Sequence, residues 1–209
     1  MKGASKLALI MQLTRATGIA RRYFVVNGFD GALTMLGMLV GFYHAELAGH
    51  TSAPLTVITS ACVGAAIALG MSGLSSAYLS ESAEQRAALQ TLEAAMVTDL
   101  QSSAHGVAAR LIPVVVALVN GLAPFGLSLL ILLPLWVPPQ VSTLVAALGF
   151  TPLETSMLLG LVVIFLLGAY LGRIGGHGWL WSGLRTLCIA LLTGAIILLA
   201  TPAGAAAWP

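Results

Sequence analysis

Asp30 is a carboxylate inside the first long apolar stretch of the chain, within residues 27–37. A charged side chain in hydrocarbon costs roughly 2.5–3.5 kcal/mol on insertion scales, so it usually faces a bundle interior or a water-filled path and often marks an ion route. Asp30 is the one acidic residue that falls well inside an apolar stretch. We therefore take it as the first candidate for cation binding.

The helical repeat groups three further side chains with Asp30. On a helix, one face carries an amide, a carboxylate, a hydroxyl and a thioether, from Asn27, Asp30, Thr34 and Met38. We predict that Asn27, Thr34 and Met38 line a pore beside Asp30. The alternative is that Asp30 only hydrogen-bonds a neighbouring helix.

The second apolar stretch offers a thioether, from Met71, and hydroxyls, from Ser72 and Ser75. A lone methionine usually fills space, and serine hydroxyls in membranes most often bond between helices. Beside a carboxylate, however, sulfur biases a site away from Mg²⁺ and Ca²⁺ and toward transition metals. Met71 is therefore a candidate metal ligand, and the two serines are candidate pore-lining residues.

A more polar segment, residues 80–110, follows the second apolar stretch. Glu81 and Glu84 lie three residues apart where that stretch ends, and an acidic cluster at a pore mouth raises the local cation concentration. Both are candidate metal ligands, and metal capture could extend to Glu93, Met96, Asp99 and His105. The alternative is an ordinary solvated helix face.

Five apolar stretches must position these residues. Of 209 residues, 58% are hydrophobic and 8% charged, whereas soluble domains carry about 25% charged residues. A spanning helix needs about 20 apolar residues, and five stretches qualify, at 23–43, 55–79, 111–136, 155–171 and 180–200. The predicted fold is one all-α integral membrane domain over residues 1–209, with a short cytoplasmic amphipathic helical linker, 80–110, between helices 2 and 3.

The Lys and Arg residues orient this domain. With five spans, all nine fall on one side, which the positive-inside rule places in the cytoplasm. The N-terminus and the linker are then cytoplasmic and the C-terminus is outside. Residues 1–22 read as an amphipathic segment along the membrane surface.

Small residues predict where helices approach closely. The second stretch carries five of them at four-residue spacing: Gly64, Ala68, Ser72, Ser76 and Ser80. The fourth stretch carries one pair with the same spacing, Gly168 and Gly172. Such patterns let helix backbones pack tightly in lipid. Cys62 and Cys188 lie in apolar stretches and are expected to be free thiols.

Enzyme chemistry and nucleic-acid binding are not indicated. The sequence has no HExxH, CxxC, Walker, GxSxG or dinucleotide motif, and no visible nucleophile–base pair. We expect no enzymatic activity and no permanently bound cofactor. The few basic residues are segregated by topology, so nucleic acid is not an expected partner.

Several runs of the sequence, taken in order, resemble the vacuolar iron transporter family. Residues 29–41 (FDGALTMLGMLVG) are similar to its Asp-Gly first helix, and residues 70–81 (GMSGLSSAYLSE), with Glu84, to its second helix and exit. Residues 165–173 and 182–185 resemble its closing helices. The likeness covers nearly the whole chain. Because the 80–110 segment is short, where full-length members have a long Glu- and Met-rich cytosolic domain, the chain looks most like a short-linker archaeal and bacterial branch.

The resemblance implies a homodimer of five-helix protomers in a prokaryotic inner membrane. It implies export of Fe²⁺, and often Mn²⁺, from the cytosol in exchange for protons, with Asp30 and Met71 lining a path at the dimer interface. Two alternatives stay open on the residues alone. The chain could be a non-transporting structural or assembly protein, or a transporter of another small solute.

Overall fold

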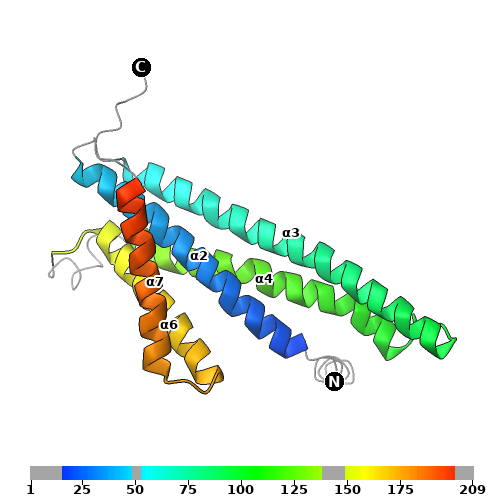
Figure 1. The fold of residues 1–209 in the computed structure, drawn as a ribbon. Helices are drawn as coiled ribbons and strands as arrows, with labels where there is room; N and C mark the ends of the chain where they lie inside the picture. Colours follow the sequence, from blue (N-terminus) through cyan, green and yellow to red (C-terminus); the bar gives the residue numbers. More distant parts are fainter. Residues whose placement is uncertain (1–15, 49–52, 138–148, 201–209) are drawn as a thin grey trace. The chain divides into compact units, whose positions relative to one another are not determined.

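The computed structural model describes residues 16–48, 53–137 and 149–200, and within them it is all-helical, without a β-strand. The helices are α2 (Ala16–Leu47), α3 (Leu55–Met96), α4 (Ala104–Trp136), α6 (Pro152–Ile174) and α7 (Trp179–Ala200) (Figure 1). All five are long and apolar enough to cross a membrane. The all-α prediction and its five apolar helices are confirmed.

The polar 80–110 segment is helical except at 97–103, but it continues α3 and begins α4, so the prediction of one linker helix over 80–110 is wrong. α3 continues from its apolar part to Met96, and α4 already begins at Ala104. No Gly or Pro occurs between Leu74 and Gly106, and Ala, Leu, Glu and Gln dominate, so nothing ends the helix where its hydrophobicity ends.

α3 ends in a left-handed turn. Val97 has φ of 51°, and the Thr98 N–H donates to the Glu93 carbonyl at 3.3 Å, which is the bond pattern of a Schellman cap. Most of the expected amphipathic N-terminal segment lies outside the described residues, and its residues 16–22 belong to α2.

The chain groups into two compact units, and α2, α3 and α4 each run through both. Unit 1 comprises Met1–Asn27 and Ala68–Pro124, and unit 2 comprises Gly28–Ile67 and Phe125–Pro209. Unit 1 therefore holds the polar part of α3 beside the start of α4, and unit 2 holds α6 and α7.

In unit 2, α6 and α7 lie side by side (Figure 1). Their backbones approach at two glycines of α6. A Cβ on Gly168 would lie 2.0 Å from Thr186 Oγ1, and one on Gly172 would lie 2.5 Å from the Ser182 side chain. The predicted close approach at this glycine pair is confirmed.

The start of α6 is also fixed by side chains. Thr151 caps α6 in a capping box with Glu154, and Pro152 begins the helix. Glu154 also accepts a hydrogen bond from Tyr43 of α2, at 3.2 Å.

Cys62 and Cys188 are both free, as expected.

Candidate functional site

Asp30 is exposed on α2, in unit 2, and Asn27, Thr34 and Met38 on the same side of the helix are half-buried. The inward face of the helix buries Ala32, Met35 and Leu39 completely. Among the described residues, the Asp30 carboxylate has no hydrogen bond or ion pair, and its neighbour Thr34 donates instead to the Asp30 backbone carbonyl, at 2.7 Å. The carboxylate is therefore available to a group outside the described part of the protomer.

The glycines beside Asp30 face side chains of α4. A Cβ on Gly28 would lie 2.7 Å from a methyl carbon of Leu127. The buried Ser128 hydroxyl donates to the Gly31 carbonyl at 3.5 Å. Gly28 and Gly31 are thus buried toward α4, while the carboxylate between them is exposed.

Asn27, which we predicted to line a pore, takes part in a network that ties three helices within unit 1. Its amide donates to the Tyr23 carbonyl at 2.9 Å and to the Asn120 side-chain oxygen. Asn120, on α4 and 5% exposed, donates in turn to the Gly73 carbonyl of α3 at 2.6 Å. Buried amides are stable in an apolar setting only when bonded in this way.

Asn120 was missed in the sequence analysis, although two signals point to it. It is an amide in an otherwise apolar stretch, and Gly121 follows it. A Cβ on Gly121 would lie 2.6 Å from the Gly70 carbonyl, and one on Gly73 would lie 2.8 Å from the Asn120 carbonyl. The glycines bring α3 and α4 close enough for the Asn120–Gly73 bond.

Met71, Ser72 and Ser75 all lie on an exposed face of α3, in unit 1, and Met71 is 56% exposed. The small-residue positions of α3 share this exposure, at Gly64, Ala68, Ser72, Ser76 and Ser80. A Cβ on Gly64 would meet no atom of the described residues within 4 Å. In the described protomer, no helix packs tightly onto this line of small residues. Met38, by contrast, is half-buried on α2.

The two glutamates at the end of the apolar part of α3 differ in their surroundings. Glu81 is 8% exposed and accepts a hydrogen bond from Gln85 Nε2 at 2.9 Å. Glu84 is exposed. Of this pair, Glu84 is the carboxylate that faces solvent.

The acidic residues further along shape the turn between α3 and α4. A Glu93 carboxylate oxygen accepts from the Leu100 N–H at 3.0 Å, and Asp99 accepts from the Gln101 N–H at 2.8 Å. Met96 and His105 are exposed. Across the ranges that the structure describes, no three His, Cys, Asp or Glu side chains converge as a metal site requires.

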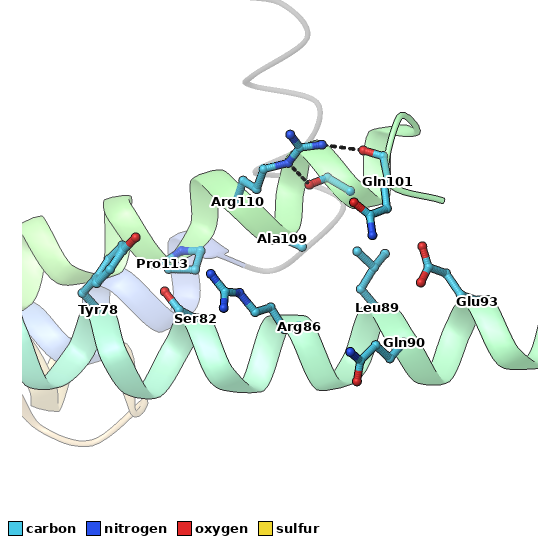
Figure 2. A pocket seen from close by; sticks show the side chains of 11 residues that line it. Tyr78, Ser82, Arg86, Leu89, Gln90, Glu93, Gln101, Ala109, Arg110 and Pro113 are labelled. Carbon is cyan, nitrogen blue, oxygen red and sulfur yellow. Dashed lines mark hydrogen bonds between the residues drawn. The ribbon is translucent and has the colours of Figure 1, made fainter. Parts of the chain in front are cut away.

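A cavity of about 570 Å³ lies in unit 1 between the polar part of α3 and the start of α4 (Figure 2). It is lined by Tyr78, Ser82, Arg86, Leu89, Gln90, Glu93, Gln101, Gly106, Ala109, Arg110 and Pro113. Arg86 and Arg110 are two of the nine basic residues that orient the chain, and no other role was predicted for them. Their meeting in one cavity follows from the extension of α3, which was not foreseen.

Comparison with known proteins assigns no function to these features. No family model matches the chain, and no solved structure matches it. The chain is 26% identical over 173 residues to an uncharacterized protein of Methanocaldococcus jannaschii, a match that covers 81% of this chain and 82% of that protein.

Proposed function

We propose that this protein is an integral membrane transporter that exports Fe²⁺ or Mn²⁺ from the cytosol in exchange for protons. The observation that supports this most strongly is the exposed Asp30 carboxylate on an apolar helix, which has no hydrogen bond or ion pair among the described residues. In a membrane, a carboxylate facing lipid is costly, whereas one facing water, a cation or a partner is not. A divalent metal that binds there offsets that cost.

A second copy of the chain would supply the missing cover. The exposed line of small residues on α3 offers a surface on which another helix can pack closely. In the homodimer that we propose, two Asp30 carboxylates face each other near the midplane. Like charges at close range favour uptake of a proton, and a bound divalent metal displaces it. Metal exit is thereby coupled to proton entry.

The other candidate residues have supporting roles in this proposal. The Met71 thioether favours a transition metal over Ca²⁺. Glu84, exposed past the apolar part of α3, attracts cations to the cytoplasmic mouth, with Glu81 beside it. The N-terminus is cytoplasmic, the C-terminus outside, and the membrane that of a prokaryotic cell. The ordered resemblance to the vacuolar iron transporter family supports the same assignment.

The rival function, a structural protein in which Asp30 only ties helices, is less consistent with these contacts. The polar tie in this part of α2 is made by Asn27 with Asn120, and Asp30 has no comparable bond among the described residues. A carboxylate kept for structure alone would be expected to hold a partner helix.

The test is metal uptake into proteoliposomes under an imposed pH gradient, with Fe²⁺ (kept anaerobic), Mn²⁺ and Ca²⁺ supplied in turn. Wild type is compared with Asp30→Asn and with Glu46→Gln, a control that neutralises an exposed carboxylate near the end of α2. We expect Fe²⁺ or Mn²⁺ uptake that follows the gradient, persists in Glu46→Gln and falls to the protein-free level in Asp30→Asn. Wild-type uptake by folded Asp30→Asn would refute the proposal.

A further inference from the structure

We infer that the cavity between α3 and α4 in unit 1 binds a phosphate group. This ligand is distinct from the transported metal, and the inference does not depend on metal transport. It rests on the two arginines and the hydroxyl and amide groups that line the cavity, and on its size.

Arg86 is the first of the two cationic groups. Its side chain reaches into the space between the helices, toward Ser82 (Figure 2). The structure gives its guanidinium no hydrogen bond or ion pair within the described residues. A planar guanidinium with all its donors available matches the geometry of phosphate oxygens.

Arg110 is the second cationic group, and the protein holds it in place. Its Nε donates to the Gly106 carbonyl at 3.2 Å, and an Nη2 proton goes to the Gln101 carbonyl at 2.5 Å (Figure 2). A guanidinium has five N–H donors, so others remain for a ligand. Arg110 therefore adds a fixed positive charge at low entropic cost.

The remaining lining suits an anion with polar oxygens. Glu93 is the one acidic lining residue, and one of its oxygens already accepts the Leu100 N–H. Two arginines against one glutamate leave the cavity net positive. Hydroxyls from Tyr78 and Ser82 can donate further bonds, and about 570 Å³ is within the range of small-molecule sites.

The position of the cavity along α3 indicates two possible sources of the phosphate. Tyr78 lies where the apolar part of α3 ends, and tyrosines favour the membrane interface. Arg86 follows eight residues later, about 12 Å along the helix, and its side chain points back toward the N-terminal end. In the proposed membrane placement, its guanidinium reaches the headgroup layer. A lipid phosphodiester and a soluble phosphate are therefore both within reach.

The test is calorimetric titration of the purified full-length protein in dodecyl maltoside, which has no phosphate. One arm adds inorganic phosphate, with chloride at equal ionic strength as its control. The other adds phosphatidylglycerol, with diacylglycerol as the phosphate-free control. Each arm compares wild type, Arg86→Gln, the charge-preserving Arg86→Lys, and Arg173→Gln, which removes an exposed arginine of α6 outside the cavity.

We expect phosphate-dependent binding that Arg86→Gln weakens about tenfold, the worth of one charged hydrogen bond. Arg86→Lys should bind more tightly than Arg86→Gln, and Arg173→Gln should match wild type. Binding in the lipid arm alone identifies a headgroup, and binding in the inorganic arm alone identifies a soluble phosphate. Three results would overturn the inference. They are no binding in either arm, equal heat from the chloride or diacylglycerol control, and equal affinity in Arg86→Gln and Arg173→Gln.

Discussion

Asn27 and Asp30 lie three residues apart on α2, yet only the first has its side chain bonded within the described chain. Asn27 belongs to unit 1, where it is linked through Asn120 to Gly73. Asp30 belongs to unit 2, where its side chain is exposed. The difference separates a polar group that holds helices together from one that is open to a partner from outside.

Small residues show the same division. At Gly168 and Gly172 of α6, atoms of α7 lie so close that no Cβ would fit. Gly64 of α3 has open space, and the small residues that follow it are exposed. Tight packing against α7 explains the glycine pair of α6. For the small residues of α3, our explanation is packing against a second copy of the chain.

The largest effect on stability is expected from Asn120→Leu. It removes one acceptor of the Asn27 amide and one donor to the Gly73 carbonyl, which breaks the polar link between the three helices. We expect a loss of about 1–2 kcal/mol in the free energy of unfolding in detergent. Asp30→Asn, measured in parallel, should lose less than about 0.5 kcal/mol, as is usual for exposed sites without special contacts.

The reverse order of these two losses would break the comparison. If Asp30→Asn costs as much as Asn120→Leu, the carboxylate is a structural tie, and the rival function gains its strongest support.

A smaller effect is expected from Gly64→Leu, which tests whether the exposed small residues of α3 contact a second copy. An added Cβ would contact no atom of the described protomer, and Leu has the higher helix propensity, so the unfolding free energy should not fall. The dimer should weaken about tenfold, because close helix approach is lost. The measurement is subunit counting by single-molecule photobleaching in liposomes over a range of protein densities.

Gly194→Leu is the matched control, since an added Cβ on Gly194 of α7 also meets no atom within 4 Å among the residues that the structure describes. It should dimerise like wild type. Equal dimerisation by both variants, or a wild type that stays monomeric at every density, would count against the proposed interface.

Hydrophobic length alone was enough to predict the five helices, because a run of about 20 apolar residues has few other uses. It could not predict where α3 ends, because helix propensity continues to Met96 after hydrophobicity stops at Leu79. The separate linker helix was wrong for this reason, and the arginine-lined cavity that the longer α3 creates was missed with it.

The candidate site divides in the same way. The position of Asp30 in an apolar stretch made it a candidate from the sequence alone, and its role stays a prediction. The partner of Asn27 lies 93 residues away, so only the packing of α2 on α4 reveals the bond. The spacing of small residues on α3 and α6 predicted close helix packing. It could not predict the partner, because the repeat is identical whether the neighbouring helix belongs to the same chain or to another.

The most direct test of the central claim is the number of metal ions that Asp30 holds. Mn²⁺ would be titrated into the purified protein in detergent, for wild type, Asp30→Asn and the Glu46→Gln control, and bound metal counted per chain. Paired Asp30 carboxylates predict one high-affinity Mn²⁺ per two chains in wild type and Glu46→Gln, and none in Asp30→Asn. Unchanged Mn²⁺ binding by Asp30→Asn would contradict the account.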